Sequence, residues 1–368
     1  LANANYYIGG NSVLLNTNLS NAAGGDIVLG LYFPQRTDPA RRFEVNDVNA
    51  NAVKAAPKCM SGQANPPVSL IFGPIVNINT VDVTRYAIAV SIGGHGAGLI
   101  ILDPDGNPGL TIDGSSTTLT VNNGAIQVNS EGTGNKGSVW NPAGSNITAQ
   151  EIDICGARDT FKDEADIPDS PPVFFDVPYM PDPLISLQPP PWDPANNLGT
   201  IDTTGTFSPG YYSGGIDLSG SQTVTLQPGI YVLGGQGLQI SGSVTFTAPG
   251  VMFYILKDTN KTVVDITGGA AITITEYKQA GSVYDGMAIF QARDNLYDAR
   301  ITGTSGMNLT GTIYFPQNHL DLGGTSLSLG IQVICWTLKV GGGGSSTDLI
   351  INYDGRNFSN RFTSFLVE

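Results

Sequence analysis

The sequence contains few charged residues. Asp, Glu, Lys and Arg make up 13% of its 368 residues, about half of the proportion that is usual in soluble domains. Lys and Arg number 17 against 31 Asp and Glu, which gives a net charge of −14. Nucleic-acid binding needs clustered Lys and Arg to neutralise phosphates, so this balance excludes a general polyanion-binding protein. The hydrophobic content of 40% also excludes ordinary disorder, which combines high charge with low hydrophobicity.

Long apolar runs and cysteines are also scarce. No apolar run approaches the roughly 18 residues of a membrane span, so we expect no membrane-spanning segment in this chain. It begins with Leu1 rather than Met, and we expect a signal or an anchor upstream. The 3 cysteines are too few for a disulfide scaffold. Cys335 lies in an apolar run and is expected in the core, whereas Cys59 and Cys155 are candidates for one disulfide bond.

Histidine is nearly absent. Neither His95 nor His319 stands beside a Ser or Cys in a recognisable nucleophile motif, so we expect no catalytic triad, no histidine metal site and no cofactor. An acidic cluster (Asp159, Asp163, Glu164, Asp166 and Asp169) opens the proline-rich stretch, and its densest part runs from Asp163 to Asp169. We interpret it as a solvated loop rather than as the paired carboxylates of a glycoside hydrolase.

Asp103, Asp105 and Asn107 resemble the start of a calcium loop, because oxygen-bearing side chains occupy alternate positions. The twelfth position of such a loop requires a bidentate Glu, but this chain has Gly114 there. The pattern therefore favours a turn rich in Asp, Gly and Pro, and these three residues are the metal candidates of this sequence.

Glycine is abundant and its spacing reveals internal repeats. The chain has 47 glycines, about twice the usual proportion. The tripeptide LSG at 218–220 is followed by ISG at 240–242 and by ITG at 266–268 and 301–303. A Pro-Gly series at 209–210, 228–229 and 249–250 runs beside it. Short runs with period-two alternation and many β-branched residues lie between these points, which is typical of strands.

A step of about 20 residues with two or three short strands is the length of one turn of a parallel β-solenoid. Each turn buries its apolar side only by stacking on the next, about 4.8 Å away. We therefore expect an all-β chain with a right-handed parallel β-helix. An antiparallel sandwich, which also consists of short strands, remains the alternative.

The pattern divides the chain into a β-rich N-terminal module at 1–108 and a β-helix at 109–368. Within the β-helix, the stretch at about 159–200 is rich in proline. Proline fixes φ and lacks a backbone donor, so this stretch is expected to lie across the stack as an extended strap. Phe174, Phe175, Tyr179 and Trp192 are its expected anchors.

Several segments together resemble one bacterial family. These are DIVLGLY (26–32), NAVKA (51–55), GAIQVNS (124–130), PDPLISL (181–187), PGIYVLGGQGLQISG (228–242), GMAIFQAR (286–293), GTIYFP (311–316) and INYD (351–354). Their order is similar to that of the TadG-like proteins associated with Tad (Flp-type) pilus assembly. The resemblance implies an N-terminal membrane helix, which this sequence lacks, then a periplasmic or surface-exposed β-module and a β-helix. It implies an envelope- or pilus-associated role and no catalytic residues.

Asn-x-Ser/Thr sequons at Asn18, Asn146, Asn260, Asn308 and Asn357 are candidate glycosylation sites and fit an exported protein. We expect a non-enzymatic structural protein of the bacterial surface or extracellular space. It associates with itself, head to tail, or with other pilus or envelope proteins, through an extended start and an aromatic tail. The alternatives are an adhesin or glycan-binding module, with Tyr211, Tyr212 and Trp192 as an exposed platform, and a β-helix polysaccharide lyase or hydrolase.

Overall fold

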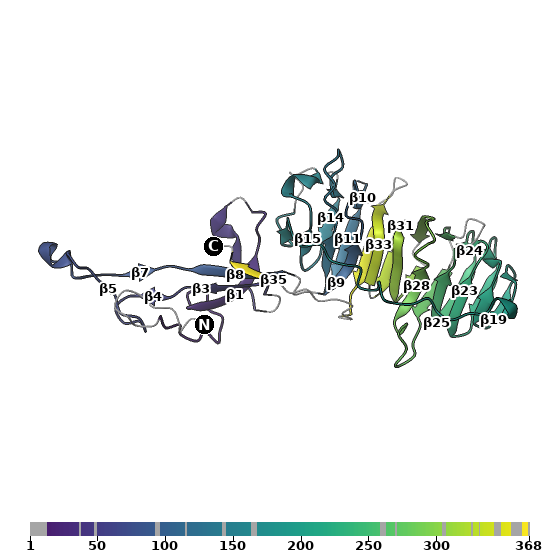
Figure 1. Ribbon diagram of the computed structural model, residues 1–368, viewed down its shortest axis with the longest axis horizontal. Helices are drawn as coiled ribbons and strands as arrows, with labels where there is room; N and C mark the ends of the chain where they lie inside the picture. Colours follow the sequence, from purple (N-terminus) through teal and green to yellow (C-terminus); the bar gives the residue numbers. More distant parts are fainter. Residues whose placement is uncertain are drawn as a thin grey trace. The chain divides into compact units, whose positions relative to one another are not determined.

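The computed structural model describes most of the chain (Figure 1). The described residues are 13–36, 38–47, 50–92, 96–114, 116–141, 145–162, 168–257, 263–268, 271–303, 307–324, 327–330, 332–341, 347–354 and 363–366. They fold as strands and short 3-10 turns, so the expected all-β class is confirmed. Among them, no helix has the length and apolar character needed to cross a membrane.

The chain forms two compact units, 1–94 with 361–368, and 95–360. We expected the division at residue 108. The first unit instead ends at residue 94, and it also includes the C-terminal residues 361–368. Strand β9 (Ala97–Ile101) pairs within the large parallel sheet of the second unit. Strand β35 (Thr363–Leu366) pairs with β8 (Ala87–Ile92) in the first unit.

The first unit is built on an antiparallel sheet of 5 strands in the order β2-β1-β3-β8-β35. The three strands not yet introduced are β1 (Ile27–Tyr32), β2 (Phe43–Val45) and β3 (Ala52–Ala55). Val28, Ile88 and Val90 are buried on one face of this sheet, in line with period-two alternation.

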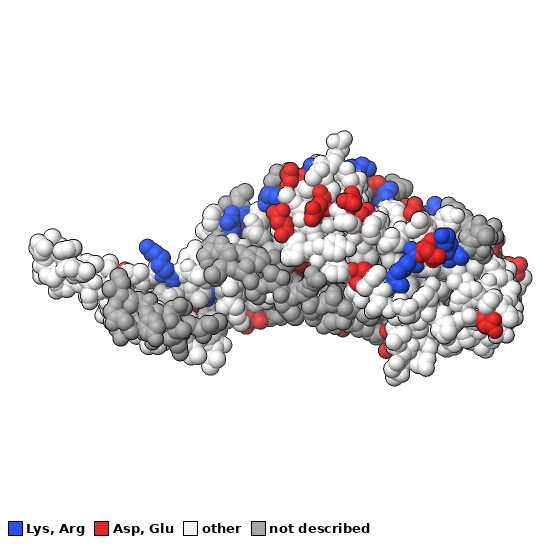
Figure 2. All heavy atoms as spheres, viewed as in Figure 1, with Lys and Arg blue, Asp and Glu red and all other residues white. Residues whose placement is uncertain are grey.

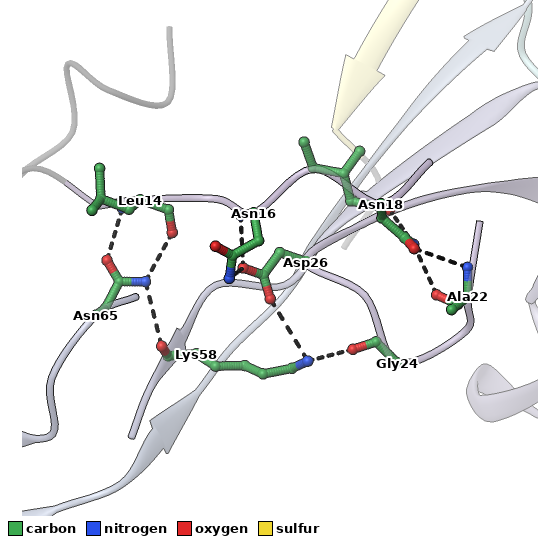
Figure 3. A network of polar contacts seen from close by, with 9 residues as sticks. Leu14, Asn16, Asn18, Ala22, Gly24, Asp26, Lys58 and Asn65 are labelled. Atoms are coloured by element: carbon green, nitrogen blue, oxygen red, sulfur yellow. Dashed lines mark hydrogen bonds and ion pairs between the residues drawn. The ribbon is translucent and has the colours of Figure 1, made fainter. Parts of the chain in front are cut away.

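Polar contacts tie the N-terminal segment to this sheet (Figure 3). Asp26 Oδ2 accepts hydrogen bonds from the backbone N–H and the side-chain Nδ2 of Asn16, both at 2.9 Å. Lys58 Nζ lies 3.6 Å from Asp26 Oδ1. The Asn65 side chain accepts from Leu14 N at 2.8 Å and donates to Leu14 O at 2.8 Å.

A long hairpin extends from the same unit (Figure 1). In it, β4 (Lys58–Cys59) pairs with β7 (Val83–Thr84), and β5 (Val68–Ser69) pairs with β6 (Thr80–Val81). A 3-10 turn, Gly73–Val76, closes the tip.

The second unit contains a parallel sheet of 26 strands, whose pairings form three ladders. The first ladder runs through β18 (Thr200–Ile201), β21 (Gly215–Leu218), β24 (Gly237–Ile240), β26 (Val263–Ile266), β29 (Ala299–Gly303), β31 (Thr312–Gly324), β33 (Gln332–Gly341), β10 (Leu110–Asp113), β13 (Val139–Trp140) and β16 (Phe161–Lys162). The second runs through β19 (Gly205–Phe207), β22 (Thr223–Leu226), β25 (Thr245–Ile255), β27 (Ala271–Glu276), β30 (Met307–Leu309), β32 (Leu327–Gly330), β34 (Asp348–Asn352), β11 (Thr118–Asn122) and β14 (Asn146–Thr148).

The third ladder runs through β20 (Gly210–Tyr212), β23 (Gly229–Leu233), β25, β28 (Met287–Gln291), β31, β33, β9, β12 (Ala125–Val128), β15 (Ile152–Ile154) and β17 (Val173–Phe174). The long strands β25, β31 and β33 each contribute to two ladders. We call one strand from each ladder, in chain order, a coil. Every register in these ladders is parallel, so the antiparallel alternative is wrong for this unit.

The spatial order of the coils differs from their order in the sequence. Strands β33 and β34, near the end of the chain, pair with β9, β10 and β11, which are the first strands of the unit. From there the chain builds coils out to β17, crosses to β18 at the opposite end of the ladders, and builds coils back to β34 (Figure 1). The chain therefore enters and leaves the stack at the same level, where Tyr353 N donates to Asn122 O at 3.1 Å.

The crossing segment at 175–199 is the strap. It is shorter than the expected 159–200, because β16 and β17 still pair within the ladders.

Glycines close the corners between ladders. Gly220, Gly242 and Gly268, the last residues of three of the repeated tripeptides, have φ of +70°, +78° and +94°. A Cβ on Gly242 would lie 2.8 Å from Gly220 N, and one on Gly268 would lie 2.8 Å from Gly242 N. The last position of the repeated tripeptide therefore requires glycine for two reasons: its positive φ, and the close stacking of successive corners.

One apolar cluster fills the interior along all coils; Leu99, Phe246, Ile289 and Val333 are among its fully buried members. Cys335 belongs to it, as expected.

Candidate functional site

The outer side of the third ladder is covered by the strap. On this outer side, residues paired in register from strand to strand form one row: Tyr211, Val232, Tyr254, Phe290, Tyr314, Ile334, Ile100, Gln127, Asp153 and Phe174. Most of the apolar members form a second cluster with Met180 and Leu184 of the strap. Tyr254 and Phe290 meet edge to face, with ring centroids 5.0 Å apart, a geometry favoured by aromatic quadrupoles. The strap thus buries an apolar outer face rather than a solvated one.

Hydrogen bonds fix the middle of the strap. Arg293 donates to the backbone carbonyls of Leu184 and Leu187, the latter at 2.9 Å. Tyr284 Oη donates to Gln188 O at 2.9 Å, and Tyr314 Oη donates to Asp182 Oδ2 at 2.5 Å. Burial, followed by the bond to Asp182, raises the pKa of Tyr314 above its ordinary value, so the phenol remains a donor. The extended backbone of the strap thereby finds partners on the stack itself.

A polar cluster holds the strap near β12 and β15. The side-chain amide of Asn129 pairs with the backbone of Met180 as a neighbouring strand would. Its Nδ2 donates to Met180 O at 2.7 Å, and its Oδ1 accepts from Met180 N at 3.0 Å. Gln127 Nε2 donates to Asn129 Oδ1 at 3.2 Å and lies 3.7 Å from Cys155 Sγ. Burial, then nearby Glu131 and Asp153, raise the pKa of the Cys155 thiol to about 12. Cys155 is therefore a protonated packing residue at neutral pH, without nucleophilic character.

Two acids lie beside this cluster. Glu151 and Asp153 are 0% and 2% exposed, and no described residue forms a hydrogen bond with Asp153 Oδ1. Burial, and secondly the charge of Glu151, raise the pKa of Asp153 well above its usual range. Sequence analysis missed both residues. The alternation of Ile152 and Ile154 with these acids placed the acids on the outer side of a strand, but nothing in the pattern indicated that this side would be buried.

An acidic cavity of about 420 Å³ adjoins the cluster, and Glu131, Cys155, Asp159 and Asp176 are among its lining residues. Of the predicted acidic group, Asp159 lies here and Asp169 is exposed, while Asp163, Glu164 and Asp166 lie outside the described residues. Within the described ranges, no three His, Cys, Asp or Glu side chains are placed to hold a metal ion. The cavity supplies acids without a basic partner in its lining, and we assign it no chemistry.

An aromatic cleft of about 300 Å³ lies at the far end of the strap, lined by Trp192, Asp193, Asn196 and Tyr211 among others. The ring centroids of Trp192 and Tyr211 lie 4.6 Å apart, and the angle between the two ring planes is 40°. The expected three-residue platform needs a correction, because Tyr212 is only 3% exposed. Tyr212 points inward, since alternation along β20 places it opposite to Tyr211. Glycan binding by the remaining pair stays a prediction.

The interior cluster reaches partly buried side chains at both ends of the ladders, although at one end Leu198 N also donates to Tyr211 O at 2.8 Å. Phe207 on β19 at one end, and Ala149 and Phe175 at the other, pack on the interior cluster but are only partly buried. Gln227 N donates to Phe207 O at 2.9 Å. Because a residue in a parallel ladder directs its N–H and C=O to the same neighbour, Phe207 faces β22, and the backbone of Thr206 faces away from the stack.

The metal candidates Asp103, Asp105 and Asn107 lie in one turn. Asp103 Oδ1 accepts from Asp105 N at 2.9 Å, the local bond of an Asx turn. Burial is the main cause that raises the pKa of Asp103. No neighbouring side chain among the described residues completes a metal site with them.

The sequons differ in their surroundings. Asn146 and Asn308 are exposed on β14 and β30. The side-chain Nδ2 of Asn18 donates to Ala22 O at 2.9 Å and to Ile27 O at 2.8 Å (Figure 3). Asn260 and Asn357 lie outside the described residues.

The cysteines and the one histidine that the structure describes form no reactive site. Cys59, Cys155 and Cys335 are buried free thiols, so the candidate bond between Cys59 and Cys155 is not formed; the two residues belong to different units. The Nδ1 atom of His319 lies 2.8 Å from Thr337 Oγ1, and His95 lies outside the described residues.

Comparisons of the chain with protein-family models, with curated proteins and with solved structures gave no match.

Proposed function

We propose that residues 95–360 form a right-handed parallel β-helix that serves as a non-enzymatic structural rod on the bacterial surface or outside the cell. The parallel ladders, the continuous interior apolar cluster and the strapped outer face support this proposal. Such a stack resists unfolding because each coil is buried by its neighbours. The similarity of the sequence segments to the TadG-like family supports an envelope- or pilus-associated setting.

We further propose that the rods associate head to tail. The carrying observation is that the interior cluster ends at both ends of the ladders in partly buried side chains, Phe207 at one end and Phe175 at the other. Open strand edges readily pair with another chain. Since all strands are parallel, the two ends differ, and a contact between unlike ends extends into a filament unless its rotation closes a ring.

The expected exchange of terminal segments is not part of this proposal. Thr363–Leu366 pairs with β8 of its own chain, and Leu14 bonds to Asn65 of its own chain. Phe358 and Phe362 lie outside the described residues.

The test compares Thr206→Pro with Thr206→Val. Proline removes the N–H that faces away from β22 and leaves the contacts of Phe207 with β22 in place, whereas valine keeps that donor. We expect the wild type and T206V to show concentration-dependent oligomers by light scattering and electron microscopy, and T206P to remain monomeric with an unchanged circular dichroism spectrum. Dispersed wild-type monomers at high concentration, or assembly of T206P equal to that of T206V, would contradict the proposal.

A further inference from the structure

The tip of the hairpin in the first unit exposes a group of large apolar side chains. Ile71, Phe72 and Ile75 are 86%, 76% and 82% exposed, and Val76 and Ile78 are exposed as well. No residue from Cys59 to Val81 is charged. Accordingly, the visible surface at the hairpin's end carries no Lys, Arg, Asp or Glu colouring (Figure 2). Contiguous exposed apolar groups of this kind mark interaction sites on soluble domains.

Several backbone groups of the tip are paired within the tip. Leu70 N donates to Asn79 O at 2.9 Å, Ile75 N to Phe72 O at 3.2 Å, and Ile78 N to Gly73 O at 2.9 Å. Pro74 has no N–H, and the strands behind the tip pair with each other. A segment that enters hydrocarbon must satisfy its backbone groups internally, because no water is present there. The internal bonds satisfy part of the tip backbone, which lowers the cost of moving the tip toward hydrocarbon.

The shape of the tip agrees with the same environment. The turn from Gly73 to Val76 is the end of a projecting hairpin (Figure 1), so its apolar side chains form a convex surface. A lipid surface accepts a convex apolar loop without a complementary cavity, whereas a protein partner must supply one. The polar residues Asn77, Asn79 and Thr80 follow directly and can occupy the hydrated headgroup level.

We propose that the hairpin tip inserts into the interface of a phospholipid bilayer and attaches the first unit to it without spanning it. The attachment is hydrophobic, because the tip offers no Lys or Arg to anionic headgroups. The net charge of −14 disfavours anionic lipids. Zwitterionic bilayers are therefore the preferred surface, and their binding changes little with salt.

The test measures co-flotation of the full chain with phosphatidylcholine vesicles. The variant Phe72→Ser with Ile75→Ser removes two highly exposed side chains, so folding is unaffected. We expect its partition coefficient to fall by about 100-fold, from the burial free energy of two such side chains. The control Val283→Ser with Leu296→Ser removes two side chains of similar exposure, 69% and 68%, from the second unit and should bind as the wild type does.

Three results would overturn the inference. The first is wild-type binding that F72S/I75S does not reduce. The second is binding that requires anionic lipid and disappears in high salt. The third is a wild type that ignores vesicles but forms oligomers that F72S/I75S dissociates, which would assign the tip to a second copy of the chain instead.

Discussion

Asp153 is held in a setting that disfavours its charge. Its side chain is buried next to Glu151, and one carboxyl oxygen has no hydrogen-bond partner among the described residues. Burial first, and Glu151 second, raise its pKa well above the usual range. The folded chain therefore binds a proton at Asp153 more tightly than the unfolded chain does. This difference links the free energy of unfolding to pH.

The sign of that link gives a prediction for Asp153→Asn. Above the unfolded pKa of about 3.9, the native state holds more protons than the unfolded state, so this residue's contribution to stability is lost as pH rises toward the folded pKa. Asparagine cannot ionise, so we expect the variant to gain stability over the wild type with rising pH, by up to about 1.4 kcal/mol per pH unit. Urea unfolding between pH 4 and 8 measures this. Asp217→Asn, at an exposed site on β21, is the control; equal pH slopes for D153N and wild type would contradict the prediction.

For single residues, the sequence predicted the structural position where that position follows from the residue type and its near neighbours in the chain. The corner glycines followed from their spacing, because a positive φ and close stacking both require glycine. Cys335 was placed in the core by the apolar run around it. Asp153 and Arg293 could not be recognised, because the burial of Asp153 and the bonds of Arg293 to the strap arise from tertiary packing.

Arg293 is one of the polar links between the strap and the stack. It lies 5.6 Å and 5.5 Å from the ring centroids of Phe290 and Tyr314, and its guanidinium bonds two strap carbonyls. The strap contains no Lys or Arg of its own, so its polar fixation depends on side chains of the coils.

Replacing Arg293 by Met should loosen the strap while keeping an apolar stem of similar length. We expect a loss of about 1–3 kcal/mol of unfolding free energy, the usual value of hydrogen bonds to a charged group. Faster amide hydrogen exchange across 182–188 should accompany it. Arg300→Met removes the exposed pair with Asp265 and should cost less than about 1 kcal/mol. Unchanged exchange in the strap of R293M would show that apolar packing alone holds it.

The strap was recognised as an element from its prolines, but only two of its four expected anchors are covered: Phe174 is buried, and Phe175 packs partly buried on the interior cluster. Tyr179 and Trp192 are exposed by 43% and 41%, whereas Met180 and Leu184 are buried. An extended segment without regular pairing has no periodicity that marks one side as inward. The side it buries is decided by the surface it meets.

The whole second unit is a continuous stack whose chain order has been permuted. Repeats in the sequence indicate that similar coils stack, but they do not indicate which coil lies on which. The pairing of β33 and β34 with β9, β10 and β11 therefore had no signal in the sequence. The same pairing explains why the segments before residue 95 and after residue 360 meet in one unit.

A rearranged chain tests this order. Residues 200–354, joined by a short Gly-Ser linker to 96–199, follow the stack from end to end and cut the chain only between the strap and β18. We expect this permutant to be β-rich and to unfold cooperatively, as does the fragment 96–354 in native order. Circular dichroism and thermal unfolding measure both. Aggregation of the permutant beside a folded native-order fragment would show that the join at Tyr353 and Ala97 is not continuous.

The permuted order also determines when the molecule can be completed during synthesis. The coils at 97–128 leave the ribosome early, yet the strands that cover one side of them, β33 and β34, are among the last to emerge. Until then, the edges of β9, β10 and β11 stay open on the nascent chain. Strands β33 and β34 must then pair with β31 and β32 on one side and with β9, β10 and β11 on the other. Completion of the stack therefore depends on a late step between residues far apart in the chain. In a crowded cell, a chaperone bound to the nascent chain, or rapid export, would protect these open strand edges from pairing with other chains.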